Sequence, residues 1–187
     1  MKKLLSILAI LGIGAVMNAG AATYKDVTVP DTVTVGGQAL VLNGMGLRTK
    51  FFFKIYVGAL YLPQKADTAA EVMAEGGPDS ILMHMIYSVD KGQFADAWHE
   101  GFKDNNPNMS AALKADVEKF VAFFGNSKKG DVITLDYIPE QGTQVSWNGK
   151  PVGSIAGGDF HQALLKVFLG PKPPTEALKA GLLGQNP

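Results

Sequence analysis

The chain of 187 residues contains no cysteine, and only one of its 17 basic residues, Arg48, is an arginine. The lack of cysteine excludes thiol nucleophiles, disulfides, iron–sulfur ligation and cysteine-bound zinc. Neither sign of charge prevails, because 17 lysine and arginine residues balance 17 aspartate and glutamate residues. A nucleic-acid-binding domain normally has a basic excess, so we expect no nucleic-acid partner. The length and a hydrophobic content of 47% suit one domain with a real core.

Motifs for metal, phosphate and nucleophile chemistry are also lacking. The glycines Gly44 and Gly46 have no third glycine behind them and lead into a predicted strand, which argues against a phosphate-binding loop. Asp131 and Asp136 stand at predicted strand ends and are interpreted as solvated. There is no G-x-S-x-G elbow. Without an H-x-x-x-H or H-x-H pair, the histidines are expected at the surface or packed, and we expect no metal and no cofactor: His84, His99 and His161.

The N-terminus has the layout of a secretory signal peptide. Met1-Lys2-Lys3 precedes an apolar run of 14 residues from Leu4 to Met17, and Ala19 and Ala21 form an A-x-A pattern. We therefore expect a signal peptide over 1–21, cleavage near Ala21, and a domain over 22–187. The mature protein would be periplasmic or secreted, and it would have no stable membrane span because the apolar run is removed.

The order of the predicted elements indicates an α+β fold. Alternating Val and Thr residues, long aromatic runs and an Asn148-Gly149 turn predict strands at 27–35 (two strands), 39–42, 48–62, 81–89, 132–138, 143–147 and 152–155. Three- and four-residue spacing with capping residues predicts helices at 68–75, 90–104, 110–124, 159–169 and 175–183. Groups of strands followed by groups of helices predict an antiparallel sheet with helices packed on one face.

The stretch from Arg48 to Leu62 is the most informative part of the chain. If it is one strand, the odd-numbered side chains form an apolar face that packs beneath the helices. The even-numbered face mixes charged, phenolic and apolar groups: Arg48, Phe52, Lys54, Tyr56 and Leu60. Such a surface suits an amphipathic ligand, with Arg48 pairing bidentately with a carboxylate or phenolate. The residues alone leave a second interpretation open, in which Arg48 is structural and pairs with an acid at the sheet edge.

Three parts of the chain carry a resemblance to a known family. The run from Leu42 to Lys50, continued by 53–62, resembles the core strand of chalcone isomerase-like proteins. Lys91-Gly92-Gln93-Phe94 and the C-terminal part from Asn148 to Pro173 are similar to the bacterial branch of that family. The resemblance covers nearly all of the domain, and it implies an open-faced β-sandwich in which helices cover one side of a large antiparallel sheet.

The resemblance also implies a cleft with catalytic polar groups, and two of the four are replaced here. In the plant enzymes, which are isomerases of the intramolecular lyase type, an Arg, a Thr, a Tyr and an Asn support ring closure of a chalcone. The Arg corresponds to Arg48 and the Thr to Tyr56, which keeps a hydroxyl group. The Tyr falls on Phe94 and the Asn near Gly101, neither of which has a polar side chain. Losing such donors costs orders of magnitude in rate, so flavonoid cyclisation is not the expected activity.

Non-catalytic members of the same fold bind fatty acids, and the resemblance implies that Arg and Tyr hold the carboxylate. We therefore predict an exported protein that binds a small amphipathic, fatty-acid-like ligand without flavonoid cyclisation. The predicted ligand-binding residues are Arg48, Tyr56, Phe52, Leu60 and Phe94, and Tyr87 is a weaker candidate. The alternatives are an isomerase or intramolecular lyase with an unknown substrate, in which Arg48 and Tyr56 act in catalysis, and a scaffold in which Arg48 is structural. No motif specifies an oligomeric state.

Overall fold

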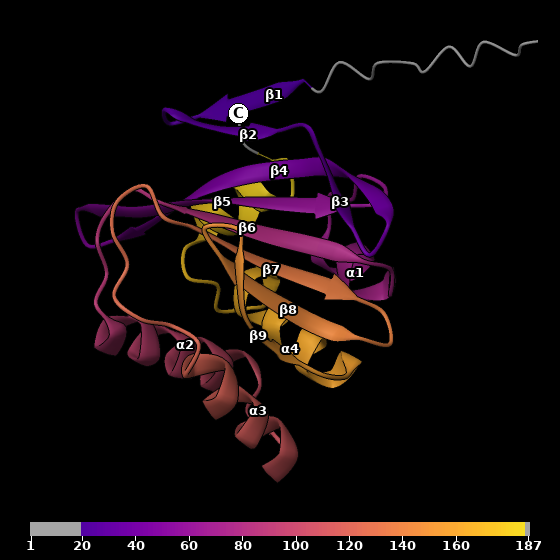
Figure 1. Cartoon of the computed structure of the whole chain (residues 1–187), viewed down its shortest axis with the longest axis vertical. Coiled ribbons are helices and arrows are strands. Elements are labelled where there is room, and N and C mark those ends of the chain that lie inside the picture. Colours follow the sequence, from indigo (N-terminus) through magenta and orange to yellow (C-terminus); the bar gives the residue numbers. More distant parts are fainter. Residues whose placement is uncertain (1–19, 186–187) are drawn as a thin grey trace, which may run out of the picture.

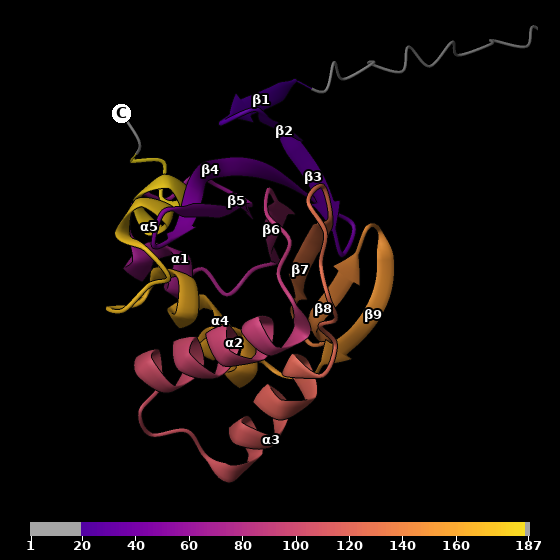
Figure 2. The ribbon, with the colours of Figure 1, turned by 90° about the vertical axis from the view of Figure 1, so that its left-hand side faces the viewer.

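The computed structural model describes residues 20–185, which form a curled sheet with helices against its concave side. The seven-stranded antiparallel sheet has the order β3-β4-β5-β6-β7-β8-β9, so strands that follow one another in the sequence are neighbours in space. The strands are β3 (Thr32–Val35), β4 (Gln38–Lys50), β5 (Phe53–Leu62), β6 (Asp79–Met85), β7 (Val132–Ile138), β8 (Gly142–Trp147) and β9 (Lys150–Ile155). Figure 2 shows the curl, with α4 on its concave side.

A separate hairpin of β1 (Ala21–Tyr24) and β2 (Val27–Pro30) lies on the outer side of the sheet, above β4 in Figure 1. The helices are α1 (Ala69–Ala74), α2 (Lys91–Asn105), α3 (Ala111–Val121), α4 (Gly158–Leu169) and α5 (Glu176–Leu182). Within the described range, no helix has the length and apolar character needed to cross a membrane. The predicted α+β class, with a large antiparallel sheet and helices packed on one face, is confirmed.

Local sequence explains where most helices begin. Thr68 and Asp90 form capping boxes with Glu71 and Gln93, and Ser110 and Thr175 accept hydrogen bonds from the backbone three residues on. The helix α4 differs from the prediction, because its N-cap is Gly157 and Asp159 lies inside its first turn. An acidic residue in that position still interacts favourably with the positive end of the helix dipole.

Two hydrophobic clusters pack on opposite faces of the sheet. The larger one joins the helices to the concave face and includes Tyr56 and Leu60 of β5. The smaller one joins the β1–β2 hairpin to the outer face and includes Val57, Ala59 and Tyr61. The prediction that the odd-numbered side chains of this stretch pack beneath the helices is therefore wrong. From Tyr56 onward, the helices cover the even-numbered side chains, and the hairpin covers the odd-numbered ones.

Candidate functional site

The central pair of the site comes from two strands rather than one. The sequence predicts a single strand from Arg48 to Leu62, but the chain turns at Phe51 and Phe52, and β4 pairs antiparallel with β5. Arg48 is the cross-strand partner of Tyr56, with a register shift next to Arg48 that marks a bulge. Side chains of cross-strand partners project from the same face of a sheet. The prediction that Arg48 and Tyr56 share a face is thus confirmed, although the assumed path of the chain is wrong.

The Arg48 guanidinium lies against the Tyr56 ring, with 5.7 Å from its Cζ atom to the ring centroid. Tyr56 is only 1% exposed, and burial raises the pKa of its phenol, while the nearby Arg48 charge acts in the opposite direction with a smaller effect. The phenol therefore stays protonated at neutral pH. The Nε atom of Arg48 is buried and has no hydrogen-bond partner. A buried donor without an acceptor costs free energy, so this N–H group is available to an anion.

Two cavities adjoin this pair. They lie between α2 and the ends of β4 and β5 next to the turn that joins these strands. The first has a volume of about 230 Å³ and the second of about 340 Å³. Both are lined by the same five residues, which form their common wall: Arg48, Lys50, Tyr56, Phe94 and Ala97. Arg48 and Lys50 thus place positive charge between the two cavities, of which the first is more polar and the second more apolar.

A residue that lines the first cavity carries a second buried donor without a partner. The Nε1 atom of Trp98 is buried and has no hydrogen-bond partner, and the Trp98 side chain lines the same cavity as Arg48. The indole ring is held by Phe120 and Phe168, with centroid distances of 4.9 Å and 5.9 Å. Sequence periodicity places Trp98 on the apolar face of its helix, which is correct for the ring. The unsatisfied N–H group could not be found from the sequence, because it depends on which groups surround it in three dimensions.

The second cavity is mostly apolar and opens beside the β4–β5 turn. Its walls include Ile55, Met85 and Val89, and its rim includes Tyr87 and Phe53, whose rings lie 5.1 Å apart. Tyr87 is 44% exposed, because β6 ends at Met85 rather than at Val89 as predicted, and the chain there leaves the sheet. The residue that the sequence gives as the weaker candidate therefore lines a cavity.

Of the predicted ligand-binding residues, Phe52 and Leu60 do not line the two cavities. Phe52 lies in the turn and is 99% exposed, so it lines neither cavity. Leu60 is fully buried in the larger core cluster and does not reach the cavities either. The turn takes Phe52 out of the strand, whereas Leu60 shares the face of Tyr56 but lies further from the turn along β5, within the core. Phe94, in contrast, lines both cavities.

The two positions that lack the expected polar groups are also at the site. Phe94 packs between the rings of Phe124 and Trp147, at centroid distances of 5.3 Å and 6.0 Å. Gly101 lines the first cavity, and a Cβ atom added there would lie 2.7 Å from Cγ1 of Val167 on α4. The glycine thus allows α2 to pack closely against α4, and a larger side chain would not fit without rearrangement.

Outside these cavities, His161 is packed, as one of the two expected placements of the histidines has it, whereas the expectation for Asp136 needs correction. His161 is buried and lies 2.8 Å from Asp79, and its ring stacks on Tyr137. Asp136 is half-buried and accepts a hydrogen bond of 2.6 Å from Ser80, and burial raises its pKa. The interpretation of Asp136 as a solvated strand end is therefore wrong. Among residues 20–185, no three His, Asp or Glu side chains gather in a way that could hold a metal ion.

Comparison with known proteins identifies the family to which this architecture belongs. A family model described as chalcone isomerase-like matches residues 21–184. The chain belongs to the chalcone isomerase-like family. Among solved structures, this family member is similar to a fatty-acid binding protein of Arabidopsis thaliana, with a TM-score of 0.65 and 14% sequence identity. The match covers 88% of this chain and 96% of the plant protein, and at this identity it shows the shared fold. No curated protein sequence matches this chalcone isomerase-like chain.

Proposed function

We propose that the adjoining cavities bind a small amphipathic acid, such as a fatty acid, and that Arg48 holds its carboxylate. The observation that carries the proposal is a pair of buried donors on one cavity, Nε of Arg48 and Nε1 of Trp98, neither of which has a partner. Each unsatisfied buried donor costs about 1–3 kcal/mol, and a carboxylate supplies the acceptor oxygens that such donors lack. Hydrogen bonds between a guanidinium and a carboxylate are also among the stronger ones in proteins.

The rest of the ligand would lie in the second cavity. Its wall of Ile55, Met85, Val89 and Phe94 suits an acyl chain. Tyr56 contributes a neutral hydroxyl group beside Arg48, because burial raises its pKa. The similar Arabidopsis protein is a fatty-acid binding protein, which supports this ligand class for the shared fold.

Binding is favoured over an isomerase or intramolecular lyase reaction by the groups on the cavity wall. The plant enzymes of the family have a tyrosine at the position of Phe94 and an asparagine near that of Gly101. Phe94 cannot donate a hydrogen bond, and the contact of Gly101 with Val167 leaves no room for an amide. The remaining polar pair, Arg48 and Tyr56, is enough to hold an anion but supplies only half of the donors that the cyclisation uses.

Native mass spectrometry of the protein purified from its own host, followed by titration calorimetry with palmitate, tests the proposal. We expect a bound acid, and we expect Arg48→Gln and Arg48→Lys to weaken palmitate binding at least about tenfold. Lys150→Gln, an exposed residue on β9, removes the same charge away from the cavities and should bind as the parent does.

Two results would overturn this proposal. One is the absence of any bound acid together with no measurable affinity for palmitate. The other is cyclisation of a hydroxylated chalcone that disappears in Arg48→Gln, which would favour the enzyme instead. If Arg48→Gln unfolds the protein, as circular dichroism would reveal, Arg48 is structural and the carboxylate must be held by other groups.

We also propose that the protein is exported and cleaved after Ala21, because of the N-terminal pattern described above. Cleavage there would remove one residue of β1 and leave three of its four pairs with β2, from Ala22 to Tyr24. The hairpin could therefore still form. N-terminal sequencing of the protein from a periplasmic extract checks this, and a first residue other than Ala22 would place the cleavage site elsewhere.

A further inference from the structure

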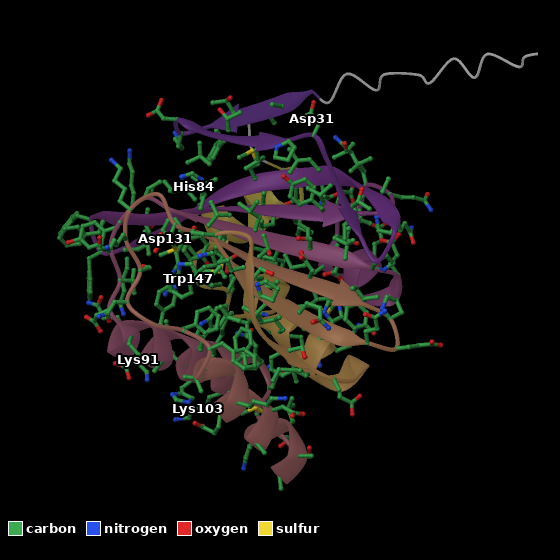
Figure 3. All side chains as sticks on the ribbon, in the orientation of Figure 1. Asp31, His84, Lys91, Lys103, Asp131 and Trp147 are labelled. Carbon is green, nitrogen blue, oxygen red and sulfur yellow. The ribbon has the colours of Figure 1, made fainter. Side chains whose placement is uncertain are left out.

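The turn between β4 and β5 exposes three consecutive phenylalanines. Phe51 is 86% exposed, Phe52 99% and Phe53 52%. Residues 20–185 expose five large hydrophobic side chains, and four of them lie here, the fourth being Tyr87. The hairpin reaches the left-hand edge of the molecule in Figure 1, and ring-bearing side chains project from its end in Figure 3. We call residues 50–54 the aromatic tip.

The backbone of the aromatic tip is unfavourable for the residue that it holds. Phe51 has a φ angle of 55°, in the left-handed region that favours glycine or asparagine in a two-residue turn. A phenylalanine there gains little from packing in the protein, since most of its surface faces solvent. Strain combined with exposure of an apolar ring points to a role outside the folding of the chain.

Basic side chains surround the aromatic tip. Lys50 and Lys54 flank the three phenylalanines in the sequence, and both are exposed. On the outer side of the sheet, Lys54, Lys25 and Lys129 line one shallow hollow, in which Asp26 is the acidic residue. The chain as a whole is neutral, so this end of the molecule has a local excess of positive charge.

We propose that the aromatic tip docks on the surface of an anionic lipid bilayer. Phenylalanine rings would enter the boundary between headgroups and acyl chains, while the surrounding lysines would bind lipid phosphates. The surface is a narrow projecting turn, whereas a stable protein interface buries about 800 Å² on each partner. A bilayer, which deforms around a projection, fits this shape better than a second copy of the chain.

Docking would also bring the second cavity to the lipid surface, because Phe51 and Phe53 lie on its rim. This consequence rests on the proposed function, but the docking itself does not. The two can be separated at Phe52, which lines neither cavity, and at Lys54 and Lys129, which also lie outside both.

The absence of cysteine allows a fluorescent reporter to be placed at one position. Phe52→Cys and, as a matched control, Val152→Cys are labelled with nitrobenzoxadiazole, whose emission rises and shifts to the blue in an apolar environment. Val152 is the fifth exposed hydrophobic residue and lies on β9. With vesicles of equimolar phosphatidylcholine and phosphatidylglycerol, we expect the change at position 52 and none at position 152. Equal changes at both positions, or none at position 52, would overturn the proposal.

Vesicle co-sedimentation of unlabelled variants gives the size of the effect. We expect Phe52→Ser to lower the vesicle partition coefficient about tenfold, and Val152→Ser to leave it unchanged. Lys54→Gln with Lys129→Gln should weaken binding to the anionic vesicles and remove most of its salt dependence. All forms keep the same N-terminal residues, so differences between them arise at the substituted positions.

Palmitate calorimetry on Phe52→Ser separates this proposal from the proposed function. We expect unchanged palmitate affinity with reduced vesicle binding. Weak palmitate binding in the parent protein with intact docking would contradict the proposed function alone. If sedimentation equilibrium instead shows a dimer that Phe52→Ser dissociates, and no vesicle binding, the aromatic tip is a contact between copies and the bilayer proposal is wrong.

Discussion

Nε2 of His161 lies 2.8 Å from Oδ2 of Asp79, and both side chains are buried. The pair joins α4 to the start of β6, although the two residues are far apart in the sequence. Burial raises the pKa of Asp79, and the His161 partner reduces that effect without cancelling it. Two neighbouring carboxyl groups, Glu75 and Asp136, also have raised pKa values because of burial, and the Asp79 charge contributes at Glu75.

The first prediction concerns the pH dependence of stability. A carboxyl group whose pKa is raised by folding stabilises the protein below its unfolded pKa, and this contribution is lost as the pH rises through the folded pKa. Asp79→Asn removes the titrating group. The parent therefore loses this contribution as the pH rises from about 4 to about 7, and the variant does not. We expect the free energy of unfolding of Asp79→Asn to increase relative to that of the parent over this range. Urea denaturation at both pH values measures it, and a constant difference would contradict the raised pKa.

The second prediction is that removing His161 lowers the free energy of unfolding strongly. His161→Ala leaves the Asp79 carboxyl buried without its partner and removes the ring stacked on Tyr137 at 3.7 Å. Breaking a buried pair in this way costs about 3–5 kcal/mol. His99→Ala is a matched control, because His99 faces Glu118 with both side chains largely exposed. Its effect on the free energy of unfolding should stay below about 1 kcal/mol.

A further prediction concerns the two glycines of β4. A Cβ atom at Gly46 would collide with the backbone carbonyl of Leu178, and one at Gly44 with that of Gly181. Both carbonyls belong to α5, so the glycines let this helix lie directly on the strand. We expect Gly46→Ala to lower the free energy of unfolding by about 1–3 kcal/mol. Gly125→Ala, where nothing lies near the added carbon, should change it little. Equal effects would show that α5 moves freely.

These glycines also show what the sequence can and cannot reveal. The family-like pattern from Asn43 to Arg48 ends at a residue that lines both cavities, and the period of the strands gives the fold class. The sequence nevertheless predicts that the strand ends at Gly44 and Gly46, because glycine is unfavourable within strands. In the structure, the strand runs through both glycines to Lys50. The reason is a tertiary contact with α5, which lies more than 120 residues further along the chain and which no local pattern encodes.

The turn at Phe51 and Phe52 is hidden in the sequence for a related reason. Two-residue turns are recognised by glycine, asparagine or aspartate, and this one contains only phenylalanine. The aromatic residues favour a strand, so the sequence predicts one strand where the structure has two. The shared face of Arg48 and Tyr56 is still predicted correctly, since cross-strand partners and residues an even number apart on one strand both share a face.

Gly101 allows a prediction about the contact between α2 and α4. Alanine normally stabilises a helix relative to glycine by up to about 1 kcal/mol. Here the added carbon would lie 2.7 Å from Val167, so we expect Gly101→Ala to destabilise the protein by about 1–3 kcal/mol. In a Val167→Ala background, the cost of Gly101→Ala should shrink or reverse. A double-mutant cycle from urea denaturation measures the coupling, and no coupling would mean that the helices separate freely.

The last prediction tests the buried indole donor. Trp98→Phe keeps an aromatic ring among Phe120 and Phe168 but removes the N–H group that has no partner in the cavity. If this group binds the carboxylate, palmitate affinity should fall about tenfold, the value of one hydrogen bond to a charged group. Hexadecanol, which has the same chain without the charge, should lose much less. Calorimetry with both ligands on parent and variant makes the comparison. An equal loss for acid and alcohol would assign Trp98 to the shape of the cavity rather than to recognition of the anion.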